Sequence, residues 1–274
     1  MPEGHTIHRL ALDHAKDLAG EHLIVSSPQG RMAEGAALLN GQLFAGVDAY
    51  GKHLFYLFGD KNPKRSTTVH VHLGLFGKFR RQASPPAAPI GQVRVRLVGS
   101  RWTVDLSGPT DCRIIDSDEE AAIRARLGPD PIRRDADPEL AWARISKRRS
   151  TIGEALMDQK VMAGVGNVYR AEALFVHGIH PMTPCQNVAR PLFDGLWETI
   201  TAMLRQGVID RRIITLSATD IDSYFGKKRA SLRGKEAVYV YKREHCLRCS
   251  TAIERWDLAG RWAYACPHCQ QTPL

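Results

Sequence analysis

Alternation of hydrophobic and polar residues marks the first half of the chain as rich in β-strands. Residues 92–97 alternate strictly, with Val93, Val95 and Leu97 on one face and Arg94 and Arg96 on the other, as in a strand with one buried face. Similar short segments separated by Gly and Pro predict further strands at 22–26, 42–48, 53–58, 68–75 and 102–106. Several short strands of this kind favour a two-layer β-sandwich.

The rest of the pattern is helical. Apolar positions spaced as on one helix face predict helices at 6–18, 118–127, 151–164, 167–177 and 191–206. Thr151 and Glu154 have the spacing of a capping box at the start of one of them. A polar, proline-marked stretch follows the β-rich region, and residues 207–234, with a basic loop at 226–233, give no clear pattern. We therefore expect an α+β multi-domain chain, with an N-terminal β-sandwich domain at 1–128, a linker at 129–149, a helical domain at 150–235 and a C-terminal module at 236–274.

Composition narrows the possible partners. The 274 residues carry a formal net charge of +9, and 43% of them are hydrophobic. A basic balance of this size points toward a polyanion such as nucleic acid, the alternative being a merely soluble basic protein. No apolar run approaches the length of a membrane span, and no signal sequence opens the chain. We expect a cytoplasmic protein without membrane contact.

Four of the six cysteines form two CxxC pairs near the end of the chain. Cys246 and Cys249 are separated by sixteen residues from Cys266 and Cys269, which matches a zinc ribbon with four thiolate ligands. Such a site has no open position for substrate, so the metal is expected to be structural. The loop between the pairs contains Arg261, which a rigid hairpin could direct at a phosphate. A folding staple without a partner is the alternative for this module.

The chain begins Met1-Pro2-Glu3. Removal of Met1 would expose the secondary amine of Pro2, which can attack an aldehyde-like carbon and form an iminium. An α-amino group titrates near ~8 and needs little tuning to act as a nucleophile at neutral pH. Glu3 would place a carboxylate beside it. Many chains begin Met-Pro only because the pair is processed efficiently, and a retained Met1 would block the amine.

A glycine-rich turn supplies the last motif. Gly164-Val165-Gly166-Asn167 precedes an apolar helix pattern, so that Asn167 falls where free backbone N–H groups and the positive end of the helix dipole could bind a phosphate. The spacing is not that of the dinucleotide fingerprint. Plain helix-hairpin architecture is the alternative interpretation.

Together these motifs resemble the formamidopyrimidine-DNA glycosylase and endonuclease VIII family, and the likeness spans nearly the whole chain. The motifs occur in family order: MPEG at the start, GKHLF at 51–55, HLGLFG at 72–77, LGPD at 127–130, AGVGNVYRAEALF at 163–175, and the closing GR at 260–261 with CPHC at 266–269. The resemblance implies a β-sandwich domain with an N-terminal helix, followed by a helix-two-turns-helix domain with a zinc-ribbon hairpin.

The resemblance also implies roles for particular residues. Pro2 would be the nucleophile and Glu3 the acid that protonates the sugar. Lys52 would bind phosphate and assist β-elimination, and Arg261 would grip phosphate and assist δ-elimination. Further DNA contacts are expected from His72, Arg126 and Asn167, with Leu75 and Phe76 on a loop that fills the gap left by the extruded base; for Leu75 a buried strand end is the alternative. One structural zinc and no catalytic cofactor are expected, and damaged DNA bound by a monomer.

Two departures from the family pattern bear on the substrate. Thr6 stands where relatives usually have a second glutamate. Residues 105–112 lack the Arg-Arg-Phe type insertion of the 8-oxoguanine branch, which with Arg126 favours the endonuclease VIII branch. The implied function is a bifunctional base-excision DNA glycosylase and AP lyase that removes oxidised pyrimidines such as thymine glycol or dihydrouracil and cuts by β,δ-elimination. The alternatives are a glycosylase specific for 8-oxoguanine or formamidopyrimidine, and a non-catalytic zinc-ribbon protein that only binds DNA.

Overall fold

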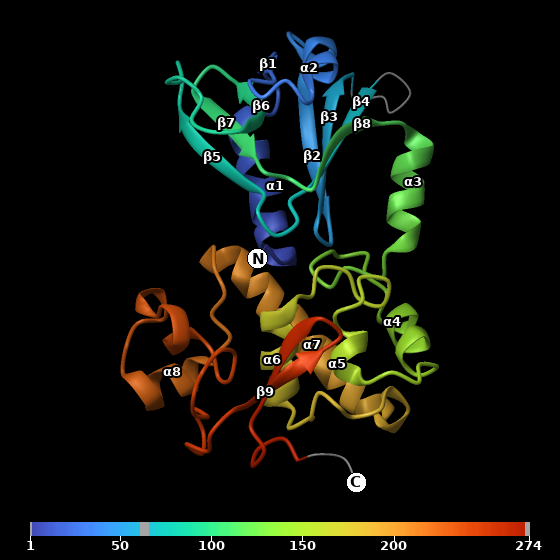
Figure 1. Cartoon of the computed structure of the whole chain (residues 1–274), viewed down its shortest axis with the longest axis vertical. Helices are drawn as coiled ribbons and strands as arrows, with labels where there is room; N and C mark the ends of the chain where they lie inside the picture. Colours follow the sequence, from blue (N-terminus) through green and yellow to red (C-terminus); the bar gives the residue numbers. More distant parts are fainter. Residues whose placement is uncertain (1, 61–65, 272–274) are drawn as a thin grey trace. The chain divides into compact units, whose positions relative to one another are not determined.

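The chain folds into two compact units in a computed structural model that describes residues 2–60 and 66–271. The first unit comprises Met1–Glu3 and Ile7–Arg126, and the second comprises Gly4–Thr6 and Leu127–Leu274. The blue to green part of the ribbon in Figure 1 is the first unit. No helix in the described ranges is both long and apolar enough to cross a bilayer.

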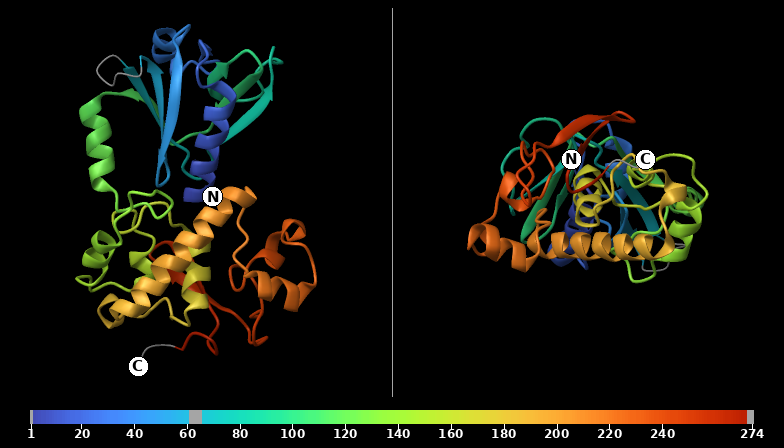
Figure 2. Two further views of the ribbon diagram at one scale, coloured as in Figure 1. Left: turned by 180° about the vertical axis from the view of Figure 1, so that it is seen from behind. Right: turned by 90° about the horizontal axis from the view of Figure 1, so that it is seen from below.

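The first unit contains two antiparallel four-stranded sheets. One has the order β1 (Ile24–Ser26), β6 (Val93–Val98), β7 (Trp102–Ser107), β5 (Lys78–Ala83), and the other β2 (Phe44–Tyr50), β3 (His53–Gly59), β4 (Ser66–His72), β8 (Asp111–Ile115). Helix α1 (Gly4–Leu18) lies alongside the strands (Figures 1 and 2). Side chains from both sheets and α1 share one buried cluster, which includes Ile7, Leu18, Phe44, Leu54, Val95 and Leu106. The predicted β-sandwich with an N-terminal helix is confirmed.

One of the two arginines on the predicted polar face of β6 is unexpectedly buried. Arg96, on the polar face of β6, is only 7% exposed and donates from Nε and Nη2 to the carboxylate of Asp105 on β7, at 2.7 and 2.8 Å. Its Nη1 donates to the carbonyl of Ala87, in the loop that covers this face. A buried arginine needs such a bidentate partner because an unpaired charge away from water is costly.

Three elements of the first unit were not expected from the pattern. Helix α2 (Ala33–Leu39), β5 and β8 have either few apolar residues or no clear period. Helix α3 (Ser117–Arg126) matches the expected one. The strand expected at 68–75 ends instead at His72, because Gly74 adopts a positive φ of 64° that extended backbone does not allow.

The second unit is helical apart from one hairpin. Its helices are α4 (Pro138–Ile145), α5 (Ile152–Ala155), α6 (Asn167–Val176), α7 (Arg190–Asp210) and α8 (Ala218–Phe225), with short 3-10 turns at Cys185–Asn187, Arg229–Ser231 and Gly234–Ala237. The hairpin pairs β9 (Glu254–Leu258) with β10 (Arg261–Ala265). Helix α4 falls inside the stretch expected to be a linker, and its Ala141 and Ile145 are buried in the core of this unit.

The capping box of α5 is confirmed, but the predicted length of that helix is wrong. Thr151 Oγ1 accepts from the Glu154 N–H, and Glu154 Oε2 accepts from the Thr151 N–H. The helix ends at Ala155 rather than near Gly164. Gln159 explains why: its side chain donates to the carbonyl of Val165 and accepts from the N–H of Gly164, which holds the following loop in a closed turn.

A buried carboxylate ties α6 to the chain that leads into the hairpin. Glu172 is fully buried, and its two oxygens accept from the backbone N–H groups of Tyr239, Val240 and Tyr241 at 2.6 to 2.9 Å. Thr215 Oγ1 donates to the same carboxylate at 2.5 Å. One side chain of α6 therefore fixes two segments that are far away in the sequence.

We expect Glu172→Gln to destabilise the second unit by about 2–4 kcal/mol, because an amide nitrogen would face backbone donors that it cannot accept from. Urea unfolding followed by far-UV circular dichroism measures the change. Glu198→Gln, on the exposed face of α7, is the matched control and should stay within about 0.5 kcal/mol of the parent. Equal stability of the two variants would show that the Glu172 cluster contributes nothing.

Candidate functional site

The start of the chain is held by a close backbone contact. Glu3 is the N-cap residue of α1 and is 1% exposed. The next residue, Gly4, belongs to the second unit and donates its N–H to the carbonyl of Gly164 at 2.8 Å. A Cβ on Gly4 would lie 2.9 Å from the Gly164 Cα, so only glycine fits here. The MPEG and AGVGN motifs, remote in the sequence, therefore meet through these two glycines.

Lys52 lies in a two-residue turn between β2 and β3. Tyr50 pairs with His53 across the hairpin, and Gly51 has a φ of 58°, in the left-handed region that such a tight turn requires. This turn places Lys52 directly before His53, the first residue of β3. His53 pairs with His72 of β4, and Lys52 lies near enough to lower the pKa of His72.

Arg126 lies at the C-terminal end of α3 and, like Lys52, acts electrostatically on His53. The pKa of His53 is lowered to about 3, first by burial and then by the nearby His72, His70, Arg126 and Lys52. The structure thus brings Lys52, His72 and Arg126 of the predicted site around one imidazole in the first unit.

Leu75 and Phe76 lie in the turn after β4. Leu75 is 50% exposed and Phe76 is 83% exposed, so the alternative of a buried strand end at Leu75 is wrong. Leu73, which is buried, anchors the turn, and a Cβ at Gly77 would lie 2.3 Å from its carbonyl oxygen. Two large apolar side chains are therefore presented to solvent on a tightly folded loop.

In the second unit, Asn167 is at the beginning of α6 as predicted, but its side chain is already engaged. Its Nδ2 donates to the carbonyl of Trp262 at 3.0 Å, and its Oδ1 accepts from Arg170. Arg170 Nη2 also donates to the Trp262 carbonyl, at 2.9 Å. These bonds fix β10 one residue after Arg261, which opens that strand at the exposed end of the hairpin.

Arg170 was missed by the sequence analysis. It is among the largest fully buried side chains, although its type is almost never buried without partners. The available signal was an arginine within an otherwise apolar helix pattern.

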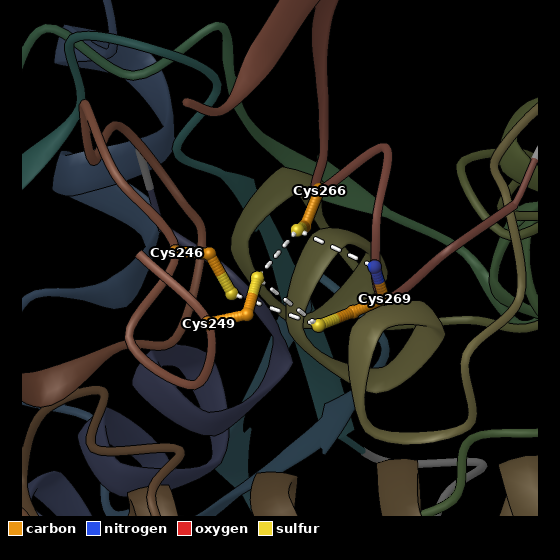
Figure 3. A group of neighbouring side chains, drawn as sticks. All are labelled: Cys246, Cys249, Cys266 and Cys269. Carbon is orange, nitrogen blue, oxygen red and sulfur yellow. Dashed lines mark hydrogen bonds between the residues drawn. The ribbon is translucent and has the colours of Figure 1, made fainter. Parts of the chain in front are cut away.

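The four predicted cysteine ligands come together. Their Sγ atoms all lie within 4.8 Å of one another, with Cys246–Cys269 at 3.9 Å and Cys249–Cys266 at 3.4 Å (Figure 3). Tetrahedral coordination with Zn–S bonds of ~2.3 Å implies sulfur–sulfur separations of about 3.8 Å, so the donors fit such an ion. Among the described residues this is the sole cluster of His, Cys, Asp or Glu side chains that could hold a metal.

Behind the cysteines, a buried glutamine joins this module to the helices. Gln270 accepts from the N–H of Cys266 at 3.0 Å and donates to the carbonyl of Ile179 at 2.7 Å. The Gln270 side chain therefore links the four-cysteine cluster to the connection between α6 and α7.

Comparison with known proteins agrees with this arrangement. The formamidopyrimidine-DNA glycosylase N-terminal domain matches residues 1–113, and the formamidopyrimidine-DNA glycosylase H2TH domain matches residues 127–218. The chain is 44% identical to Endonuclease 8 1 of Mycobacterium tuberculosis (strain ATCC 25618 / H37Rv), over 98% of this chain and 100% of that protein. It is 29% identical to the formamidopyrimidine-DNA glycosylase of Gloeobacter violaceus, over 99% and 97% of the two chains.

The fold is also that of a solved DNA complex. Lactococcus lactis Fpg, bound to DNA that contains N7-benzyl-Fapy-dG, superposes with a TM-score of 0.81 at 23% identity, over 99% of this chain and 100% of that one. The fold and the motifs define a base-excision repair glycosylase. The chain belongs to the formamidopyrimidine-DNA glycosylase and endonuclease 8 family, whose members are DNA glycosylases with AP lyase activity.

We expect Gly4→Ala to destabilise the protein by about 1–3 kcal/mol, because the new Cβ must push the Gly164 backbone away. Thermal unfolding measures the loss. Gly35→Ala is the control, since its Cβ would meet only the flexible side chains of Met32 and Ile114. A Gly4→Ala variant as stable as Gly35→Ala would contradict the close approach.

Replacing Cys249 by Ala should abolish stoichiometric metal binding, because only three of the four thiolate ligands would remain. Metal content per chain, measured by inductively coupled plasma mass spectrometry, tests this. Cys185→Ala, a buried cysteine outside the cluster, should keep its metal. Retention of full metal content by Cys249→Ala would exclude the four-thiolate site.

Proposed function

We propose that this chain removes oxidised pyrimidines from DNA through a Schiff base at Pro2 and then cleaves the strand by β,δ-elimination. The observation that best supports the proposal is the burial of Glu3 at the start of α1, directly after Pro2, with Gly4 bonded to the AGVGN loop. The buried Glu3 therefore directly follows the residue whose nitrogen becomes free once Met1 is removed.

In this mechanism the secondary amine of Pro2 attacks the anomeric carbon of the flipped-out nucleotide. Glu3 gives a proton to the sugar oxygen as the ring opens and the base departs. The resulting iminium makes the neighbouring sugar hydrogen acidic, so that first one phosphate and then the other is eliminated. Hydrolysis of the final iminium restores the amine.

Cations are needed where negative charge collects on the departing phosphates. Lys52 and Arg126 would serve as cations in the first unit and Arg261 in the second, while His72 and Asn167 would make neutral hydrogen-bond contacts to phosphate. Asn167 has a second role here, because with Arg170 it holds the Trp262 carbonyl and so positions Arg261. Zinc is the proposed metal, and when bound it holds the four thiolates and thus the hairpin in one geometry.

Leu75 and Phe76 are proposed to fill the space that the extruded base leaves. Their exposure is otherwise unfavourable for large apolar side chains, and filling the gap would offset an unstacking cost of a few kcal/mol. The protein is proposed to act on its substrate as a monomer.

The choice of pyrimidines is supported by two facts. The 44% identical relative is named an endonuclease 8, whereas the formamidopyrimidine-DNA glycosylase above is 29% identical. Strands β7 and β8 are joined by only residues 108–110, which leaves no room for a long insertion loop.

Thr6, in place of a glutamate, leaves proton transfer to Glu3.

Borohydride trapping on an abasic-site duplex tests the nucleophile. The protein should give a covalent adduct, and Pro2→Gly should slow trapping by roughly tenfold or more while DNA affinity changes little, because a primary amine replaces the secondary one. A preparation that retains Met1 should give no adduct. Undiminished trapping by that blocked form would rule out the N-terminal amine and favour another nucleophile, and no trapping by any form would favour a protein that only binds DNA.

Excision assays on a small lesion panel test the substrate. Thymine glycol and dihydrouracil should be released faster than 8-oxoguanine from otherwise identical duplexes, by about tenfold, which corresponds to roughly 1.4 kcal/mol in the barrier. Faster release of 8-oxoguanine would place the activity with the purine branch of the family.

A further inference from the structure

Three histidines lie together at the end of the β3–β4 hairpin, beside Lys52. His53 opens β3 and His72 closes β4 opposite it, while His70 pairs with Phe55 two residues along. The ring of His53 lies between the other two, with centroids 4.8 Å from His72 and 5.1 Å from His70, and the planes are within 22° of parallel. Three adjacent imidazoles on one sheet surface are more than packing requires.

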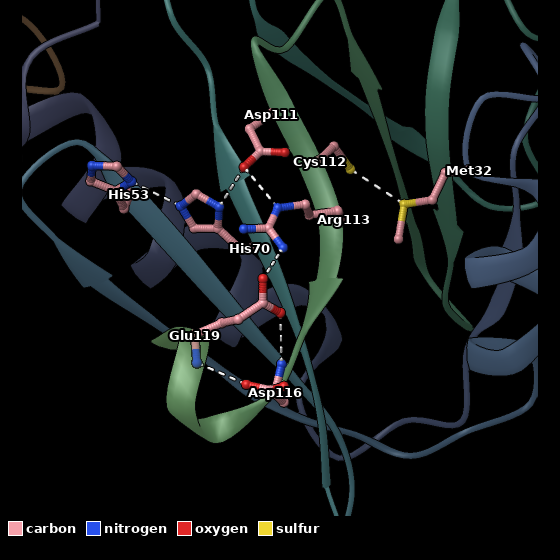
Figure 4. Close-up of polar contacts among 8 residues, drawn as sticks. All are labelled: Met32, His53, His70, Asp111, Cys112, Arg113, Asp116 and Glu119. Carbon is pink, nitrogen blue, oxygen red and sulfur yellow. Dashed lines mark hydrogen bonds and ion pairs between the residues drawn. The ribbon is translucent and has the colours of Figure 1, made fainter. Parts of the chain in front are cut away.

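A carboxylate behind this cluster fixes the protons on the rings. Asp111 Oδ2 accepts from Nδ1–H of His70 at 3.0 Å, and His70 Nε2 lies 2.8 Å from Nδ1 of His53 (Figure 4). A neutral imidazole has one N–H, so His70 uses its proton on Asp111 and can only accept at Nε2. His53 must then donate from Nδ1, which leaves a lone pair on its own Nε2.

The charges around the cluster keep it neutral in the free protein. The pKa values of His53, His70 and His72 are all lowered, chiefly by burial. Lys52 from the turn and Arg126 from α3 act in the same direction, and Asp111 opposes them.

The remaining charged groups nearby are largely paired with each other. On β8, Arg113 bonds Asp111 and Glu119, and on α3, Arg124 pairs with Glu120 and stacks on Phe55. Arg113 nevertheless lowers the pKa of His70, so the neutral state of the cluster is set by burial and by the cations Lys52, Arg113 and Arg126, against Asp111.

We propose that His53 is a phosphate-binding residue which, beside Lys52, takes up one proton as a DNA backbone phosphate binds. This inference rests on the proposed function, in which Lys52 contacts phosphate. A proton from solvent adds to Nε2 of His53, and the imidazolium then donates from Nε2 to a phosphate oxygen and from Nδ1 to His70. Asp111 stabilises the added charge through His70.

The physical reason for the coupling is the lone pair. A neutral His53 would present Nε2 as an acceptor to an anion, which is repulsive, whereas the protonated ring presents a charge-assisted donor. A phosphate within about 4–6 Å also raises the pKa of an imidazole by about 1–3 units, which offsets part of the lowering by burial and cations. Binding of DNA and of the proton therefore favour each other, and affinity rises as pH falls.

The test measures affinity for a duplex with an uncleavable tetrahydrofuran abasic analogue, by fluorescence anisotropy from pH 5.5 to 8.5 at constant ionic strength. Calorimetry in buffers of different ionisation enthalpy gives the number of protons taken up. His53→Asn keeps an N–H for His70 but lacks the outer nitrogen. It should bind up to about fourfold more weakly at pH 5.5, converge with the parent at pH 8.5, and take up fewer protons.

Two further variants sharpen the result. Asp111→Asn can still accept from His70 but lacks the charge, so it should show a smaller proton uptake than the parent. His22→Asn, at an exposed histidine elsewhere in the first unit, should match the parent throughout. An equal loss of affinity by His53→Asn at every pH would show a structural role, and unchanged proton uptake would also overturn the proposal.

Borohydride trapping separates this inference from the proposed function. The parent and His22→Asn should both form the Pro2 adduct at pH 8.5. If the parent binds and traps DNA without histidine-dependent proton uptake, only the inference fails. If the parent neither binds nor traps, the proposed function fails and His53 has no phosphate to bind.

Discussion

The close approach of two glycine backbones, Gly4 and Gly164, is the constraint on which the second unit's part of the site depends. Their hydrogen bond ties the first turn of α1 to the loop around Gly164 within the second unit. The loop that contains Gly164 is closed by Gln159 and leads directly into Asn167. Asn167 then holds the hairpin through the Trp262 carbonyl. A series of short contacts therefore runs from Gly4 to the strand that begins at Arg261, and each contact has at least one backbone atom as a partner.

The pattern of the sequence predicted the elements with a clear period of apolar residues. Strand β6 and helix α6 were predicted nearly to the residue for this reason, although both also bury polar side chains. Strand β5 was not, because its residues are largely polar and its place at a sheet edge leaves them exposed or half-buried. Helix α5 was predicted too long, since the turn after it is closed by Gln159, a tertiary contact that no local period reveals. Arg96 shows the same limit, because its burial depends on a loop that folds over the sheet.

The candidate site divides in a similar way. The cysteines were predictable from spacing alone, because ligand geometry around a metal restricts that spacing. The glycine turn was identified from its residues and the exposed loop by family resemblance, and the structure explains why glycine occupies positions in both. Arg170 and the Asp111–His70–His53 chain were not predicted, because each joins residues at least 17 positions apart or from different strands. Contacts of that kind are properties of the strand register, which local sequence does not specify.

In the turn that carries Leu75 and Phe76, the backbone path and the exposed side chains at its tip are determined separately. Gly74 has no space for a Cβ beside Thr110, and Gly77 has none beside Leu73, so the backbone path between them is dictated by packing. The two outward side chains touch little of that packing, as their exposure shows. Exchange of either one would alter the shape and polarity of the tip while the path stays the same. A family whose members act on different damaged bases could thus change the side chains at these two positions without changing the backbone of the turn.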